Sequence, residues 1–340
     1  MLCNLKIKSF SFKYFYIFMI GLLAIILSMR PSKAEGATLA FKRICQSKPS
    51  CYLSIIARLH HAPFPYDGMV GDRNQPFFDH MDPKNGQRMH TTDSGTILSE
   101  TSHYLDNRVL IHIPPKFNPK KPFYVLVFFH GHFTEIYSTL VEEMLLIKQI
   151  NAVSHNIILV APQMVLNAAD SSPGKLYRPR GFTNMMGDVS RVLKKIMGQK
   201  FAKRFNKAPV ILTAYSGGYR ALAYTLDRGL PEDQIKRLYG VILLDALYGE
   251  LDKFDTWLQR SDHGFLVNFY GPSSTPLSVE LQQKLQERSQ AWSQSLSKQL
   301  ISRGIYFLSV PTSHHSIVLD GPPRWPLVYI LNSIAKPTLK

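Results

Sequence analysis

Ser216 is the serine whose setting suits nucleophilic chemistry. It follows the β-rich apolar run 208–215 and precedes the helical pattern 217–229, within the letters Ala-Tyr-Ser-Gly-Gly. A serine at the apex of a tight strand-to-helix turn needs small residues two positions away on each side, and Ala214 and Gly218 are small. Such a turn lifts the hydroxyl clear of the sheet, where it can attack a carbonyl carbon. The pattern predicts a nucleophile elbow; the structural alternative is a glycine-rich turn with an incidental serine.

The chain resembles the α/β-hydrolase superfamily over about residues 107–336. The resemblance rests on four strings, "FFHGH", "AYSGG", "LLDALYG" and "SHHS", which follow the order that the superfamily gives to its serine, acid and histidine. "AYSGG" followed by "LLDALYGELDKF" is also similar to a group of exported bacterial hydrolases of undefined substrate. Membership implies hydrolysis of an ester, thioester or amide through an acyl-enzyme, and does not choose among them.

A base and an acid have to accompany the serine, because its hydroxyl is a poor nucleophile until an imidazole accepts the proton. His314 and His315 lie in the loop after the last predicted strand. His314 is preferred because it comes first and resembles the Ser-His context of related esterases; two exposed loop histidines are the structural alternative. Asp245 ends the strand "GVILLD" and is the preferred acid.

The position of the acid departs from the commoner family pattern, which places it one strand later. The later strand, "GFLVNFYG", ends without a carboxylate, whereas a minority of the family uses the earlier strand that Asp245 fits. Asp262 precedes that later strand, and the other lesser candidates are Glu250, Asp252 and Asp255.

Two N–H groups must meet the oxyanion that forms during acyl transfer. Gly217 N–H, directly after the nucleophile, is one expected donor. The strand "YVLVFFHGH" ends with the His-Gly pair that lipases and esterases carry here, so His132 or Phe133 is expected to supply the other. His130 is expected to brace the loop.

Residues 246–263 are a candidate lid, and the residues expected to line the substrate pocket are Tyr215, Tyr248, Phe254 and Trp257.

These residues must be positioned by strands that alternate with helices. The strands are expected at 108–115, 123–131, 156–162, 208–216, 238–249, 264–271 and 305–311, and the helices at 134–150, 181–198, 217–229, 279–304 and 324–335. Continuous apolar strands indicate burial on both faces, which predicts an α/β fold with a mostly parallel, doubly wound sheet. Chemistry in such a sheet lies at the carboxyl ends of the strands.

The N-terminal third is organised differently. Residues 1–34 combine a basic start, an apolar run over 14–29 and small residues at 32 and 34, which predicts a signal peptide and export to the periplasm or medium; an uncleaved anchor is the alternative. Residues 35–106 are expected to form an extension packed on the hydrolase domain 107–340. Short helical pieces are expected at 37–46 and 51–61, and a hairpin tip at 82–92. Cys45 and Cys51 are expected to form a disulfide in an oxidising compartment.

The composition of the chain limits the kinds of partner and cofactor that we expect. The formal net charge is +16, of which the first 34 residues supply five positive charges and no acid. The basic residues are scattered along the sequence without a nucleic-acid motif, so no nucleic-acid partner is expected, and a membrane only through an uncleaved N-terminal segment. No metal motif, dinucleotide fingerprint or P-loop is present, so no metal and no cofactor are expected.

The preferred function is therefore a carboxylesterase- or lipase-like serine hydrolase that acts on a small-molecule or cell-envelope ester. The first alternative is a serine peptidase or amidase on the same fold. The second is a hydrolase-like binding protein without activity.

Overall fold

Long apolar strands with both faces buried form the centre of the fold, as their composition requires. The computed structural model describes residues 41–44, 53–321 and 323–336, so the predicted signal peptide and the Cys45–Cys51 pair lie outside the described residues. The main sheet has nine strands in the order β1-β2-β6-β8-β7-β9-β10-β11-β12. These strands are β1 (Phe41–Ile44), β2 (Leu53–Arg58), β6 (Arg108–Ile113), β7 (Tyr124–Phe129), β8 (Ile157–Pro162), β9 (Val210–Tyr215), β10 (Leu238–Leu244), β11 (Phe265–Tyr270) and β12 (Ile305–Ser309).

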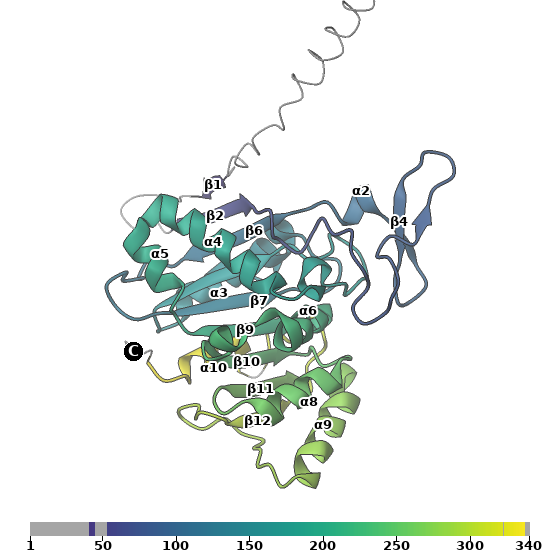
Figure 1. Ribbon diagram of the computed structural model, residues 1–340. Coiled ribbons are helices and arrows are strands. Elements are labelled where there is room, and N and C mark those ends of the chain that lie inside the picture. Colours follow the sequence, from purple (N-terminus) through teal and green to yellow (C-terminus); the bar gives the residue numbers. More distant parts are fainter. Residues whose placement is uncertain (1–40, 45–52, 322, 337–340) are drawn as a thin grey trace, which may run out of the picture. The chain divides into compact units, whose positions relative to one another are not determined.

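The sheet is mostly parallel. The six strands from β8 to β12 in that order run parallel to one another, whereas β6 is antiparallel to β8, and β2 is antiparallel to both β6 and β1. The carboxyl ends of the six parallel strands therefore lie along one edge (Figure 1). This strand order is that of an α/β-hydrolase fold, and it confirms the expected mostly parallel sheet.

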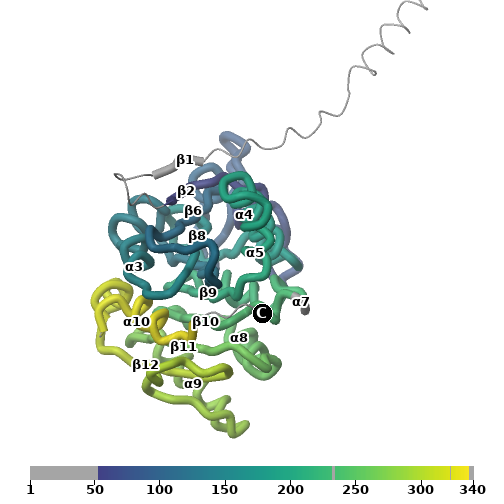
Figure 2. The backbone as a smooth tube through the Cα atoms, turned by 90° about the vertical axis from the view of Figure 1, so that its left-hand side faces the viewer, coloured from purple at the N-terminus to yellow at the C-terminus, as the bar shows by residue number. Residues whose placement is uncertain are grey.

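Helices cover both faces of the sheet (Figures 1 and 2). One face carries α4 (Gly181–Met197), α5 (Gln199–Phe205), α6 (Tyr219–Tyr224), α8 (Leu251–Arg260) and α9 (Thr275–Glu287). The other carries a π-helical segment (Ile136–Glu143), α3 (Leu146–Ala152) and α10 (Pro326–Asn332). Shorter helical segments are α2 (Glu100–His103), α7 (Glu232–Ile235), the 3₁₀ turns Gly174–Tyr177, Ser216–Gly218 and Pro272–Ser274, and the π turn Thr225–Gly229.

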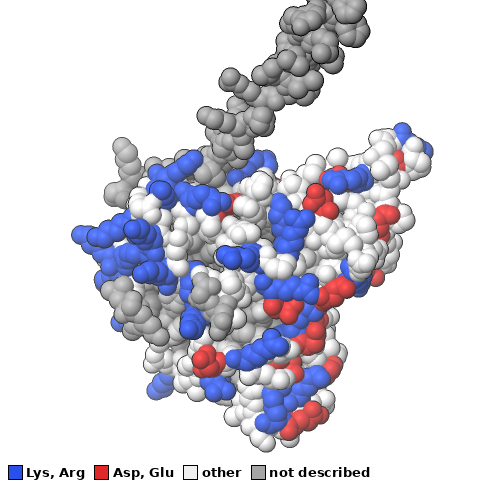
Figure 3. Space-filling view, viewed as in Figure 1, with Lys and Arg blue, Asp and Glu red and all other residues white. Residues whose placement is uncertain are grey.

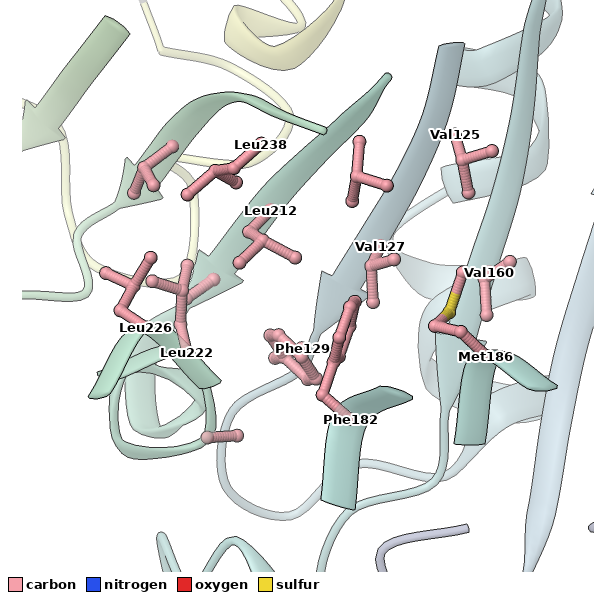
Figure 4. Close-up of a cluster of buried hydrophobic side chains, with 14 of the residues drawn as sticks. Val125, Val127, Phe129, Val160, Phe182, Met186, Leu212, Leu222, Leu226 and Leu238 are labelled. Atoms are coloured by element: carbon pink, nitrogen blue, oxygen red, sulfur yellow. The ribbon is translucent and has the colours of Figure 1, made fainter. Parts of the chain in front are cut away.

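The amphipathic pattern of α4 explains how one face is sealed. Phe182, Met185, Met186 and Val189 recur at helical spacing and are buried against strand residues such as Val127 (Figure 4). Burial of this apolar surface is the main force that holds helix and sheet together. The core therefore fixes the strand ends that carry the site.

A small antiparallel sheet stands apart from the main one. It consists of β3 (His80–Met81), β4 (Arg88–Thr91) and β5 (Ile97–Ser99). The turn between β3 and β4 is closed by a hydrogen bond from Gly86 N–H to Asp82 O at 2.8 Å, and Gly86 has a φ of +69°. The predicted hairpin tip is thereby confirmed.

Four predicted helices are wrong in kind or length. The pieces expected at 37–46 and 51–61 contain the strands β1 and β2, because β2 pairs with β6 over six residues. The helix expected over 279–304 ends at Glu287. Beyond it the chain turns back, and Ser293 bonds to the backbone of β12 at Ile305 and Phe307. The helix expected over 134–150 is two segments, and the Glu135 side chain caps the first.

Candidate active site

The turn after β9 places Ser216 at the carboxyl edge of the sheet. Ser216 has a φ of +51°, a left-handed conformation that a serine adopts only where its surroundings enforce it. A Cβ on Gly218 would clash with the carbonyl oxygen of Phe129, and one on Gly131 would lie 2.5 Å from Ser216 Cβ. The elbow is therefore pressed against the end of β7, and only glycines fit at these two contacts.

His314 joins Ser216 to Asp245. Its Nε2 lies 2.9 Å from Ser216 Oγ, and its Nδ1 lies 2.6 Å from Asp245 Oδ2. The carboxylate accepts a hydrogen bond from Nδ1–H, which leaves Nε2 unprotonated toward the serine hydroxyl. The expected meeting of serine, histidine and acid at the strand ends is present. His315 is exposed and contacts the His314 ring edge-on at 5.5 Å, and no hydrogen bond joins it to Ser216 or Asp245.

Asp245 is fully buried yet ionised. It has a φ of +43° at the end of β10, and its Oδ1 accepts hydrogen bonds from Gly271 N–H at 3.1 Å and from the Ser274 hydroxyl. Burial by itself would raise the pKa of this carboxyl, but the hydrogen bonds from His314, Ser274 and Gly271 lower the pKa to about 2. The site thus keeps a negative charge behind the imidazole.

Two tyrosines hold the imidazole. The Tyr215 ring stacks on His314 at 5.2 Å with an interplanar angle of 15°, and its hydroxyl donates to His314 O at 3.3 Å. Burial and the charge of Asp245 raise the pKa of Tyr215 to about 12, so this hydroxyl remains a donor. Tyr248 Oη lies 3.1 Å from Asp245 Oδ2 and 3.2 Å from His314 Nδ1. Both residues, expected to line the substrate pocket, contact the histidine.

The loop after β7 faces the elbow. A Cβ on Gly217 would lie 2.5 Å from His132 Cδ2, so the His132 side chain touches the residue after the nucleophile. Phe133 N–H donates to Ala168 O at 3.0 Å and is therefore not available to an oxyanion. His132 N–H makes no hydrogen bond among the described residues. Of the two residues expected as the second oxyanion donor, His132 fits better.

His130 braces this loop, in keeping with its expected role. It is buried, its Nδ1 lies 2.8 Å from Gly131 O, and its Nε2 accepts the Met164 N–H at 2.8 Å. Burial lowers the pKa of His130 to about 4, opposed in part by the hydrogen bond to Gly131. The neutral ring fixes the turn that leads to His132.

Several loop residues that support the site carried no sequence signal. Ser171 Oγ lies 2.8 Å from His132 Nε2, and its neighbour Asp170 accepts the Tyr104 hydroxyl at 2.8 Å. Ser274, which donates a hydrogen bond to Asp245, lies in the 3₁₀ turn after β11. Only the position of these serines after strand ends could have drawn attention to them.

Trp257 and Phe254 are the pocket-lining residues that the structure does not bring to the site. Both lie on α8 and are buried in the core between that helix and the sheet, so the prediction that they line a substrate pocket is wrong. Their spacing of three residues places both side chains on the face of α8 that packs against the core. The lesser acid candidates also lie elsewhere: Glu250 pairs with Lys253 and Arg220, Asp252 with Lys253, Asp255 with Arg288, and Asp262 with His263.

Within the described ranges, no group of three or more histidine, cysteine or acidic side chains is placed to hold a metal ion. The helices of the same ranges include none with both the length and the apolar character of a membrane span.

Comparison with known proteins gives distant structural likenesses. No family model matches the chain, and no curated protein sequence matches it. A feruloyl esterase module from Clostridium thermocellum is 13% identical, with 82% of this chain and 99% of that one covered, at a TM-score of 0.37. An S-formylglutathione hydrolase from Agrobacterium tumefaciens is 11% identical, with 81% of this chain and 94% of that one covered, at a TM-score of 0.42.

A third solved structure, an α/β serine hydrolase without lid from Xanthomonas campestris, is 12% identical, with 74% of this chain and 94% of that one covered, at a TM-score of 0.35. All three scores lie below 0.5. The fold assigned above therefore rests on the chain's own strand order.

Proposed function

We propose that this protein is a serine hydrolase that cleaves a carboxylic ester through an acyl-enzyme on Ser216. The observation that carries the proposal is the hydrogen-bonded series Ser216–His314–Asp245, with 2.9 Å and 2.6 Å between its members. Nucleophile, base and orienting carboxylate in this succession are what acyl transfer by a serine requires.

The proposed reaction has two halves. Ser216 Oγ attacks the carbonyl carbon while His314 Nε2 takes the hydroxyl proton, and His314 then gives that proton to the leaving alkoxide. Water attacks the acyl-enzyme in the second half, with His314 again as base, and Ser216 recovers its proton as the carboxylic acid leaves. Asp245 stabilises the imidazolium in both halves without itself becoming protonated.

The oxyanion is proposed to lie between the N–H groups of Gly217 and His132. The first N–H groups of a helix lack intrahelical partners, and Gly217 lies in the 3₁₀ turn Ser216–Gly218 that leads into α6. Burial lowers the pKa of His132; Asp170 opposes this shift, and the charges of His314 and Arg220 add to it. A neutral His132 ring bonded to Ser171 would hold its backbone N–H in place.

An ester is preferred over an amide because an alkoxide leaves with less help from a general acid than an amine does. The test compares p-nitrophenyl esters and p-nitroanilides of the same short acyl groups. The proposal expects kcat/KM for the esters to exceed that for the anilides by at least about two orders of magnitude. Equal or faster cleavage of the anilides would support the amidase alternative, and turnover of neither would support a binding protein.

We also propose that the protein is exported, on the sequence pattern of residues 1–34 alone. Mass spectrometry of the cell envelope and medium fractions without reductant is the test. The expected mature N-terminus lies near Glu35, with Cys45 and Cys51 bridged; an intact Met1 or two free thiols would contradict the proposal.

A further inference from the structure

Lysines that the sequence spreads over two segments gather on one face of the fold. They lie in the β6–β7 connection and over the end of α4 and α5, where Figure 3 shows a concentration of basic side chains. We call this set the basic face: Lys116, Lys120, Lys121, Lys194, Lys195, Lys200, Lys203 and Lys207.

The charges of the basic face are not neutralised by the described part of the protein. All eight lysines are exposed, and none lies within ion-pair distance of a described carboxylate. Residues 107–134 and 189–226 contain no Asp or Glu. Arg191, at the margin of the face, pairs instead with Asp188. Like charges on one face repel one another, so an anionic partner stabilises the arrangement.

Arg204 links the two segments that carry the basic face. Its guanidinium donates to the backbone carbonyls of Pro119, Lys120 and Lys121, which ties the β6–β7 connection to α5. It also lies over the Phe123 ring, which stacks on Phe201 at 5.6 Å. The lysine side chains of the connection are therefore left to solvent while its backbone is fixed.

An apolar cavity adjoins the basic face at the amino ends of the strands. Its volume is about 780 Å³, and it is lined by Arg204 and Lys207 together with the rings of Phe123, Tyr239 and Phe265. Ile301 at its margin is 63% exposed. The lining includes one carboxylate, Asp262, which is paired with His263. Surface charge and apolar space thus occur side by side.

We propose that this end of the protein docks on an anionic phospholipid surface. Eight exposed lysines on α4, α5 and the loops beside them suit many headgroup charges spread over a surface better than they suit a single ligand. The neighbouring cavity favours a lipid over nucleic acid or an acidic polysaccharide, because neither of these has an acyl chain to place in it. Lysine stems can also lie along the apolar part of the interface while their ammonium groups stay hydrated.

The docking orientation has a consequence for the site. The basic face lies at the amino ends of β7 and β9, and Ser216 lies at the carboxyl end of β9. Six residues of strand span roughly 20 Å. Ser216 then faces away from the membrane, toward substrates dissolved in the adjacent compartment.

Vesicle flotation of the full chain tests the proposal. The vesicles consist of phosphatidylcholine alone, or of equal parts phosphatidylcholine and phosphatidylglycerol. The patch variant carries Lys194→Gln, Lys195→Gln and Lys203→Gln, and the control of equal net charge carries Lys84→Gln, Lys148→Gln and Lys284→Gln. The N-terminal segment is common to all three proteins, so its own affinity cancels in the comparison. Thermal unfolding verifies that each variant is folded.

The expected result is salt-sensitive binding that prefers the phosphatidylglycerol vesicles. Each lysine near an anionic surface strengthens binding by roughly fivefold, so the patch variant should bind at least about tenfold more weakly while the control binds like the wild type. Ile301→Ser should weaken vesicle binding but not binding to polyglutamate. Equal binding to both vesicles, equal loss in both triple variants, or tighter binding to duplex DNA or polyglutamate than to vesicles at the same salt would overturn the proposal.

Discussion

The Tyr248 hydroxyl lies 3.1 Å from Asp245 Oδ2, the carboxylate oxygen that also accepts the hydrogen bond from His314 Nδ1–H. Tyr248 follows the acid by three residues, so the turn after β10 supplies both. Burial raises the pKa of the Tyr248 hydroxyl, and the charge of Asp245 and the hydrogen bond to that carboxylate raise it further. The hydroxyl therefore remains a donor. Tyr248 thus positions the acid and, through it, the base.

Tyr248→Phe tests this relationship. Loss of the hydroxyl should lower kcat for ester hydrolysis by roughly tenfold, equivalent to about 1.4 kcal/mol of a hydrogen bond to a charged group, with KM unchanged. Tyr219→Phe is the matched control, because that hydroxyl contacts Arg220 at 3.3 Å and not Asp245. A rise in KM with unchanged kcat would instead assign Tyr248 to substrate contact.

Gly131→Ala should impair the site without a large loss of fold. The new methyl group would lie 2.5 Å from Ser216 Cβ and 3.0 Å from Oγ, so the nucleophile has to move. Displacement of a reacting group by about 1 Å can cost a factor of about 10² in rate. Gly187→Ala on α4 is the control: its new methyl group would lie 3.8 Å from the nearest atom, Arg191 Nη1, so this variant should keep full activity. Steady-state kinetics with thermal unfolding would separate the two, and full activity of Gly131→Ala would show that Gly131 does not press on the nucleophile.

The chemistry of the site was easier to predict than its supports. Ser216 carries a local signal, because strand, small residues and helix follow one another within a few positions. Asp245 and His314 could be placed by strand ends, since the carboxyl ends of parallel strands share one edge. The choice of His314 over His315 depends on ring direction, which is set by stacking on Tyr215 and is absent from the sequence.

Features that depend on distant pairing could not be predicted. β2 becomes a strand because β6 offers it a partner about 50 residues later in the chain, an interaction with no local pattern. The lysines of the basic face look scattered in sequence because α4, α5 and the β6–β7 connection meet only in the fold. Trp257 follows Phe254 at helical spacing on α8, and this spacing predicts a core position and not a pocket position.

Buried histidines should make the stability depend on pH. Burial lowers the pKa of His112 to about 4, with the hydrogen bond to Asn151 acting in opposition. The unfolded chain takes up this proton near its ordinary pKa of about 6.5 and the folded chain does not, so stability is present above that pH and is lost as the pH falls toward about 4. His112→Gln should reduce the slope of unfolding free energy against pH by about 1.4 kcal/mol per unit in this window. Urea unfolding at several pH values measures the slope; an unchanged slope would contradict the account.

Fluorophosphonate labelling is the most direct test of the claim that Ser216 is an activated nucleophile. The purified protein is labelled, digested and mapped by mass spectrometry, alongside Ser216→Ala and Asp245→Asn. The account predicts one adduct, on Ser216, that is absent from Ser216→Ala and forms far more slowly in Asp245→Asn, while ester hydrolysis by Ser216→Ala falls by a factor on the order of 10³ or more. An adduct on another residue, or labelling that survives in Ser216→Ala, would contradict the central claim.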